Sequence, residues 1–411
     1  LVAYGEFAEI MPQIHRGYFD VVAETESRFH LSFRDEAFGD GEAKDIILSQ
    51  LAAVFTIERR SPMSRELIPI IENLPNFAPN VLENYIANNA PRFLKDLAEA
   101  DLITNASVRH IFGFDRECFL VIRAVVLAFA ELCEKLATTI YGLVLEEKLP
   151  ERSMYEQLEW VSVGLQVDWL VPFWATLANV PVEHVERFLE FYSIDFREEL
   201  PSHRGGDGFF PPFARFRDIL SFSPLLVRTF LQVRNAIFAF SKSNKEVFDS
   251  FVSHDLEPVL LKQAIELFHR GGNWITKEDI KFPGGQIDLL VASPEDDRVL
   301  LIQAKGNLPP HGPRLTRRLA DRVHEGLAQI KKFEALTEEV QRQVIEQALG
   351  RKIGKVVVQQ ALMTRSCFGT PEVFADSFPY IRLTAPLLSL ALEYHRDASL
   401  PTTVAGLVNA V

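Results

Sequence analysis

The chain has 411 residues, of which 47% are hydrophobic, and its 56 Asp and Glu outnumber 43 Lys and Arg to give a formal net charge of −13. This length accommodates two or three domains, each with its own core. The three cysteines, Cys118, Cys133 and Cys367, form no CxxC pair, which argues against a disulfide scaffold or a zinc site and is typical of a reducing cytoplasm.

Residues 1–240 are dominated by apolar residues at helical spacing, for instance from Cys118 to Leu145. We predict a mainly α-helical region here, of one or two subdomains, with a regulatory or recognition role, followed by a second domain over residues 241–411. The most apolar run, Cys118 to Ala130, is interrupted by Arg123 and is too short to span a bilayer, so we expect a soluble, cytoplasmic protein without membrane contacts. Neither a phosphate-cradling Gly-rich loop nor a GxSxG motif occurs, which argues against a nucleotide-driven motor and a serine hydrolase.

Two segments of the helical region could contact nucleic acid. Residues 177–189 loosely resemble a helix-turn-helix, but their second helix contains almost no arginine, so ordinary helix packing is the favoured interpretation. Residues 203–217 alternate aromatic and basic side chains in a Gly- and Pro-rich stretch, and such a segment can stack bases of single strands. Because Phe is usually buried, we favour a packing role here as well.

The second domain shows a clear order of elements. A helix is expected over Glu257–Arg270, where Gly271-Gly272 ends it after a basic last turn. A strand over Trp274–Phe282, a hairpin over Gln286–Lys305 and a helix over Leu315–Leu336 follow. Residues 355–363 then form a strand rich in β-branched side chains. The predicted order is therefore α-β-β-β-α-β with a mixed sheet.

The hairpin brings three polar residues together. Its turn at residues 293–297 is centred between Glu295 and Asp296, which pairs positions whose numbers add to 591. Asp288 then lies opposite Gln303, with Cβ atoms roughly 5 Å apart. Lys305 shares their face because side chains repeat every second residue.

Both faces of this hairpin are largely apolar, which predicts a buried central pair of strands. In such a place an unpartnered charge is costly, so the polar residues need a function or a partner. The alternative interpretation is a solvent-facing row on an ordinary half-buried hairpin. The face of the polar residues also carries Leu290, Ala292, Val299 and Leu301, and the other face is expected to carry Ile287, Leu289, Val291, Leu300 and Ile302.

With Asp288 in one strand and Gln303-Ala304-Lys305 in the next, the segment resembles the PD-(D/E)XK nuclease superfamily. The match is to its Mrr-like variant, which has Gln in the middle position. The resemblance covers residues 245–395 and implies a restriction-endonuclease-like fold. It also implies a metal-dependent endonuclease that hydrolyses phosphodiester bonds in DNA, in restriction or other anti-phage genome defence. By the same resemblance Asp288 and Gln303 hold a divalent metal, and Lys305 activates water or steadies developing charge.

The superfamily often has a further acidic ligand on the first core helix, and Glu257 and Glu266 are the candidates. At 100° per residue Glu257 shares the inward apolar stripe, whereas Glu266 lies with Lys262 and Arg270. We therefore select Glu257, although Pro258 places it at the helix start.

Mg²⁺ is the expected cofactor and Mn²⁺ its expected substitute, because hard oxygen ligands suit both. The ligand set would be Asp288, Glu257, the amide oxygen of Gln303 and the backbone carbonyl of Ala304. The neutral Gln303 weakens this set relative to three carboxylates. An inactive nuclease fold that serves in nucleic-acid binding or assembly is therefore the alternative function.

From Gln303 to Phe333 seven basic residues stand against two acidic ones, a local charge of +5. Arg314, Arg317, Arg318 and Arg322 are the candidate contacts to a DNA backbone. A solvated helix face is an equally good interpretation. RNA as substrate, a symmetric homodimer for duplex cleavage or a larger assembly, and a regulatory protein partner of the N-terminal region all remain open.

Overall fold

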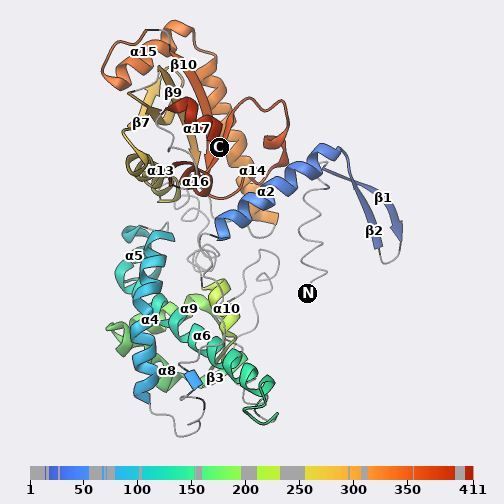
Figure 1. Ribbon diagram of the computed structural model, residues 1–411, viewed down its shortest axis with the longest axis vertical. Helices are drawn as coiled ribbons and strands as arrows, with labels where there is room; N and C mark the ends of the chain where they lie inside the picture. The colour runs from blue at the N-terminus through green and yellow to red at the C-terminus, as the bar shows by residue number, and fades with distance from the viewer. Residues whose placement is uncertain are drawn as a thin grey trace. The chain divides into compact units, whose positions relative to one another are not determined.

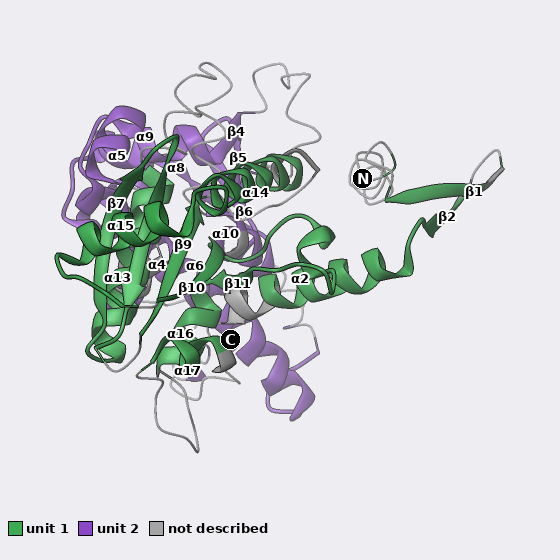
Figure 2. Cartoon of the chain, turned by 90° about the horizontal axis from the view of Figure 1, so that it is seen from above, with its two compact units in different colours: residues 1–57, 206–208, 252–411 green, residues 58–205, 209–251 purple. Residues whose placement is uncertain are grey.

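The computed structural model describes residues 14, 18–25, 28–54, 67–68, 71, 79–100, 104–151, 153, 160–195, 211–231, 255–294, 297–306, 313–354, 356–393 and 403–410. The chain forms two compact units (Figure 2). Unit 1 comprises residues 1–57, 206–208 and 252–411, and unit 2 comprises residues 58–205 and 209–251. This division differs from the predicted one between residues 240 and 241, because residues 1–57 join the C-terminal unit.

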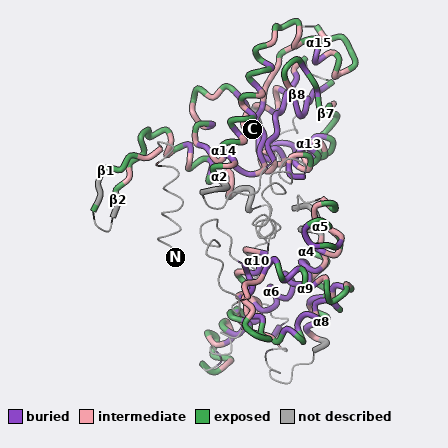
Figure 3. Tube along the Cα trace, turned by 180° about the vertical axis from the view of Figure 1, so that it is seen from behind, coloured by how far each residue is buried: buried purple, intermediate pink, exposed green. Residues whose placement is uncertain are grey.

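Unit 1 is built on a five-stranded mixed sheet with the order β11-β10-β9-β8-β7. Figure 1 labels β7, β9 and β10 of this sheet. β7 (Ile275–Phe282), β8 (Gly285–Ala292) and β9 (Arg298–Lys305) are antiparallel neighbours. β10 (Val357–Thr364) and β11 (Ile381–Thr384) continue the sheet in parallel with β9. The central hairpin is buried on both faces, as predicted, and the tube of β8 is coloured as buried in Figure 3.

Helices cover both faces of this sheet. α13 (Glu257–Gly271), α16 (Ala385–Glu393) and α17 (Val404–Ala410) pack on one face through a shared apolar core. α14 (Pro313–Glu334) and α15 (Glu338–Leu349) pack on the other. The predicted order of helix, three strands, helix and strand is confirmed, and α15, β11, α16 and α17 add to it. Unit 1 is thus a mixed α/β structure.

The N-terminal residues that the structure describes are joined to the rest of unit 1 by contacts of one helix. β1 (Phe19–Thr25) and β2 (Arg28–Phe33) form an antiparallel pair that leads into α2 (Glu36–Val54). Asp45 of α2 accepts hydrogen bonds from the backbone N–H groups of Phe368, at 2.6 Å, and Gly369, at 2.7 Å. A Cβ at Gly41 would lie 2.7 Å from the carbonyl oxygen of Pro371, so helix and loop are in close contact. These contacts explain the correction to the domain boundary.

Asp45 allows a stability prediction. Burial raises the pKa of its carboxyl to about 6, against the lowering effect of the two backbone N–H groups. Because the pKa is higher in the folded protein than in the unfolded chain, the contribution of Asp45 to the unfolding free energy is largest below pH 4. That contribution is lost as the pH rises towards 6, where the buried carboxyl must ionise. Asp45→Ala should therefore destabilise the loop by about 2 kcal/mol at pH 4 and by less at pH 8, because the buried N–H of Phe368 and the half-buried N–H of Gly369 lose their acceptor.

Amide hydrogen exchange at Phe368 and Gly369 measures this effect, with exposed Asp40→Ala on the same helix as the control. Unchanged exchange of both amides in Asp45→Ala would show that the Asp45 side chain does not hold the loop.

Unit 2 is mainly helical in its described residues. Its central element is α6 (Arg116–Leu145), against which α4 (Pro79–Ala100), α5 (Asn105–Phe112), α8 (Val167–Ala178), α9 (Val182–Tyr192) and α10 (Pro224–Phe230) are arranged. A four-stranded sheet, which the sequence analysis did not predict, has the order β3-β6-β5-β4 and comprises Val163–Gln166, Ile219–Phe222, Phe213–Phe216 and Ser193–Asp195. Across the described residues of the chain, every helix is too short or too polar to cross a bilayer.

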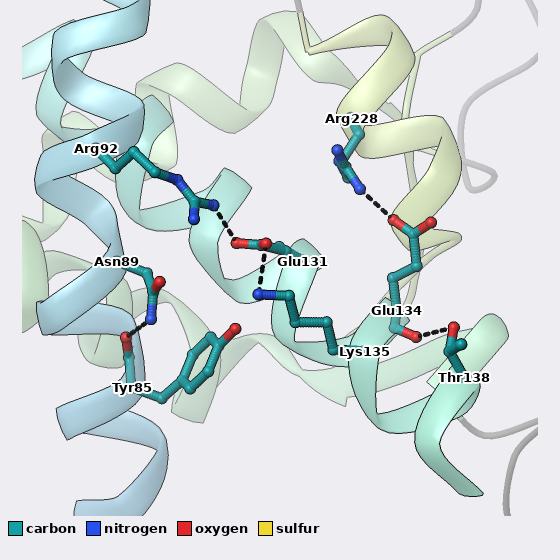
Figure 4. A network of polar contacts seen from close by, with 8 residues as sticks. All are labelled: Tyr85, Asn89, Arg92, Glu131, Glu134, Lys135, Thr138 and Arg228. Carbon is teal, nitrogen blue, oxygen red and sulfur yellow. Dashed lines mark hydrogen bonds and ion pairs between the residues drawn. The ribbon is translucent and has the colours of Figure 1, made fainter. Parts of the chain in front are cut away.

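Ion pairs tie the helices of unit 2 together (Figure 4). The buried carboxylate of Glu131 on α6 lies 2.7 Å from Arg92 of α4 and 2.8 Å from Lys135 one turn away. Glu134 of α6 lies 2.5 Å from Arg228 of α10. The buried Arg123 donates from Nε to the carbonyl oxygen of Leu231 at 2.6 Å, which explains how a charge is accommodated in the most apolar run.

Two segments of the N-terminal region, residues 177–189 and 203–217, were predicted to pack rather than to contact nucleic acid. The helix-turn-helix-like segment spans α8 and α9, and the described surface of α9 carries Glu183, Glu186 and Glu190, while its Arg187 pairs with Glu190. This acidic face favours packing over DNA binding. Residues 203–210 lie outside the described residues, and the buried Phe213 packs on aromatic rings of the unit 2 core.

Candidate metal centre

The candidate site lies where β8 begins and β9 ends. β8 and β9 pair Leu289 with Ile302 and Val291 with Leu300, which is the predicted register of positions that add to 591. The next pair in this register is Asp288 with Gln303, and the amide Nε2 of Gln303 donates a hydrogen bond to Oδ2 of Asp288. The hairpin therefore brings these two side chains together as the sequence predicted.

Asp288 also replaces a backbone acceptor. The ladder between β8 and β9 stops at Leu289 and Ile302, and the N–H of Ala304 donates to Oδ2 of Asp288 at 2.8 Å. The N–H of Ala304 therefore borders the carboxylate of Asp288.

One prediction about the hairpin faces is wrong. Ile287 packs in the cluster that contains Leu290 and Leu301, not with Leu289 and Val291. The face changes beside Asp279 of β7, which has a left-handed φ of 54° and lies between the paired positions Glu278–Leu289 and Ile280–Ile287. A left-handed residue interrupts the regular alternation of a strand, which the sequence pattern does not reveal.

The environment of the site disfavours the ionised form of Asp288. Asp288, Gln303 and Lys305 are 6%, 4% and 4% exposed. Burial raises the pKa of Asp288 to about 7, Lys305 and the Ala304 N–H oppose this rise, and the carboxylates of Glu257 and Asp279 add to it. A further positive charge at the site would offset the burial of this carboxylate.

Glu257 joins the site from α13. It is the first residue of that helix and precedes Pro258, as expected, and its Oε1 lies 3.5 Å from Nζ of Lys305. Its side chain is 21% exposed. Glu266, the other candidate, is solvent-exposed, and its Oε1 lies 4.0 Å from Nζ of Lys262. The structure therefore brings Glu257, and not Glu266, to Lys305.

Two glycines that the sequence analysis missed make this approach possible. A Cβ at Gly306 would lie 2.3 Å from the backbone N and 2.6 Å from the Cα of Glu257. A Cβ at Gly326 of α14 would lie 3.2 Å from Cγ of Lys305 and 2.8 Å from Cδ1 of Leu362. Gly306 admits the start of α13, and Gly326 leaves room for the Lys305 stem. A glycine inside a helix, where it is unfavourable, was the available signal for Gly326.

The donor set fits a hard divalent cation. Two carboxylates, from Asp288 and Glu257, stand with the Gln303 amide and the Ala304 backbone, and magnesium prefers such oxygens while retaining several waters. No group of three or more His, Cys, Asp or Glu suited to a metal occurs in the part of the chain that the structure describes. Gln303 directs its NH₂ to Asp288, so the amide must turn to present its oxygen to a cation.

Gln303→Glu tests this ligand set. An added carboxylate should tighten Mg²⁺ binding by about tenfold, since ligand charge governs affinity for hard cations. Calorimetric titration of the full chain with Mg²⁺ measures the dissociation constant. Gln303→Leu, which has no oxygen, should weaken binding in the same experiment. Equal affinities in wild type and both variants would remove residue 303 from the ligands.

The predicted phosphate contacts lie on α14. Arg317 is exposed, Arg318 and Arg322 are half-buried, and Nη1 of Arg322 lies 3.3 Å from Glu325. Arg314 is part of the helix, but its side chain lies outside the described residues. Arg322 precedes Gly326 by four residues, about 6 Å along the helix axis. The arginines thus lie on the turns of α14 that precede its contact with Lys305.

Comparisons of the chain with protein-family models, with curated proteins and with solved structures found no match.

Proposed function

We propose that this protein is a metal-dependent nuclease that hydrolyses phosphodiester bonds in DNA, and that unit 1 has a restriction-endonuclease-like fold of the PD-(D/E)XK type. One observation carries the proposal. Asp288, Gln303 and Lys305 converge, nearly fully buried, at one end of a central hairpin, and Glu257 reaches the same point from α13. A role in restriction or other genome defence accompanies the proposal, on the resemblance of these residues to the Mrr-like enzymes.

The residues divide the work of phosphodiester hydrolysis. Asp288 and Glu257, with the oxygens of Gln303 and Ala304, would hold Mg²⁺ or Mn²⁺. When bound, the ion would supply a Lewis acid for the phosphate and would lower the pKa of a water. In the hydrolysis a water oxygen would form a bond to phosphorus while the bond from phosphorus to one bridging oxygen breaks. The attacking water loses one proton and the leaving oxygen gains one. Lys305 offers a compact positive charge to the negative charge that develops.

Substrate contact is assigned to the basic face of α14. A nuclease must bring a polyanion to carboxylates, so local positive charge is required although the chain carries −13 overall. Arg317, Arg318 and Arg322 would contact phosphates beside the centre, with Arg314 on the same helix. Binding should therefore weaken steeply as the salt concentration rises.

The test uses the full chain and four substrates: supercoiled plasmid, linear duplex, single-stranded DNA and RNA. Each is incubated with Mg²⁺, Mn²⁺ or chelator, beside Asp288→Ala and Lys305→Ala. We expect cleavage of DNA with either metal, none with chelator and none by the variants. Equal cleavage by wild type and both variants would show that the centre is assigned wrongly, and cleavage of RNA alone would reassign the substrate.

A second candidate function is an inactive nuclease fold that binds nucleic acid or assembles a complex. The observation in its favour is the neutral Gln303, whose amide satisfies Asp288 without any cation. Salt-sensitive DNA binding without cleavage of any substrate, together with Mg²⁺ affinity unaffected by Asp288→Ala, would favour this function.

A further inference from the structure

Thr364, the last residue of β10, has a buried hydroxyl group that lacks a hydrogen-bond partner within the described residues. The residue is 0% exposed. Buried hydroxyl groups in folded proteins are nearly always satisfied by protein or by ordered water. Thr384 on the neighbouring strand is equally buried, but its Oγ1 accepts a hydrogen bond from the N–H of Leu387 at 3.3 Å.

The sheet places Thr364 directly beside Lys305. β9 and β10 are parallel and pair Lys305 with Thr364, so the two side chains stand on one face about 5 Å apart. This is the face covered by α14, because Leu362, two residues earlier, packs with Leu319 and Val323 of that helix. The Lys305 stem passes Gly326 on the same face.

Lys305 has hydrogen-bonding capacity to spare. An ammonium has three donors, and within the described residues its ion-pair partner is Glu257, whose Oε1 lies 3.5 Å from Nζ. Oγ1 of Thr364 is therefore an acceptor without a partner, and the neighbouring Lys305 ammonium has N–H donors to spare. The two groups make no direct hydrogen bond. A buried water commonly bridges two neighbouring polar groups that do not bond to each other directly.

We propose that Thr364 is a positioning residue of the centre, whose hydroxyl holds Lys305 through one buried water. The Lys305 ammonium donates to the water oxygen, and the water donates to Oγ1 of Thr364. This second tether, in addition to the Glu257 contact, restricts the long lysine side chain to the end of the sheet. The inference rests on the proposed nuclease function for its catalytic consequence, but not for the water itself.

Two substitutions separate this role from packing. Thr364→Val keeps the shape and removes the hydroxyl, and Thr364→Ser keeps the hydroxyl. Residues that orient metal ligands typically contribute 10- to 100-fold to metal affinity or activity, and we expect the same order for a residue that orients Lys305. We expect Thr364→Val to lower kcat at least tenfold with KM unchanged, and Thr364→Ser to restore kcat to within about threefold of wild type. Thr384→Val is the matched control and should leave kcat unchanged.

High-resolution crystal structures of the full-length wild type, Thr364→Val and Thr364→Ser provide the readout that does not depend on activity. We expect a water within about 3.2 Å of both Oγ1 and Nζ in wild type and Thr364→Ser, and a displaced ammonium in Thr364→Val. That water in a protein that cleaves no substrate would support the tether and refute the proposed function. A wild type without the water, or a Thr364→Val protein with wild-type kcat and Lys305 unmoved, would overturn the proposal.

Discussion

Asp288→Asn should produce a protein that is inactive and more stable than wild type. Asparagine retains the shape and can still accept from the Ala304 N–H, but it lacks the negative charge that a metal requires. Because the side chain at position 288 is only 6% exposed, solvent cannot replace the missing carboxylate as a metal ligand. We expect cleavage to fall by about a thousandfold or more, the order of effect seen when a charge that stabilises a transition state is removed.

The gain in stability follows from the pKa of Asp288. Burial raises it to about 7, so ionisation is harder in the folded protein than in the unfolded chain. The wild type therefore loses stability as the pH rises from about 4 to about 7, and the variant does not. Above pH 7 the difference in unfolding free energy should be on the order of 2–4 kcal/mol in favour of Asp288→Asn.

Urea unfolding at pH 5 and pH 8, with chelator present, measures this difference. Saturating Mg²⁺ should stabilise the wild type and leave the variant unchanged, since ligands that bind only the folded state stabilise it. An inactive variant with reduced stability at pH 8 would indicate that Asp288 is a structural residue.

Gly306→Ala should disrupt the centre without touching any of its functional groups. The added Cβ would lie 2.3 Å from the backbone N of Glu257 and 2.6 Å from the carbonyl carbon of Leu256. Backbone atoms cannot rotate away as a side chain can, so the start of α13 must move by about 1 Å to reach ordinary contact distance. Such overpacking typically costs about 1–3 kcal/mol.

The functional effect should exceed the loss of stability. A displaced α13 carries Glu257 away from Lys305, and a misplacement of about 1 Å can reduce a rate by about a hundredfold. Cleavage rates and Mg²⁺ affinity should therefore both fall in Gly306→Ala while the far-ultraviolet circular dichroism is retained. Gly354→Ala is the matched control, because a Cβ at that exposed position meets no atom within 4 Å. Wild-type cleavage by Gly306→Ala would show that the position of Glu257 does not matter.

The core of the candidate site was predictable because its information is local. Asp288 and Gln303 are separated by one tight turn, so the position of that turn sets their register. The alternation of a strand then assigns Lys305 to the same face. The order of α13, β7, β8, β9, α14 and β10 was equally readable from periodicity and from Gly and Pro signals, whereas α15, β11, α16 and α17 were not predicted. The alternation failed at Ile287, where a left-handed residue on the neighbouring strand changes the local geometry.

The contacts between residues far apart in the sequence could not be predicted from the spacing of apolar residues. Asp45 and Phe368 are 323 positions apart, and no periodicity indicates that α2 caps the loop after β10. Lys305 and Thr364 become neighbours only because β10 returns in parallel after α14 and α15, and such a crossover leaves the register free. The four-stranded sheet of unit 2 is made of strands of three or four residues, too short for alternation to show.

The sequence by itself therefore determined the core order of helix, three strands, helix and strand, the hairpin register and the convergence of Asp288, Gln303 and Lys305, because each depends on periodicity within one element or on a single hairpin. Only the tertiary structure decided that Glu257 approaches Lys305 across Gly306, that Thr364 stands beside the lysine and that α2 belongs to unit 1. These contacts depend on how buried surfaces fit together in space, and side-chain volume and backbone clearance are properties of the packed structure rather than of sequence spacing.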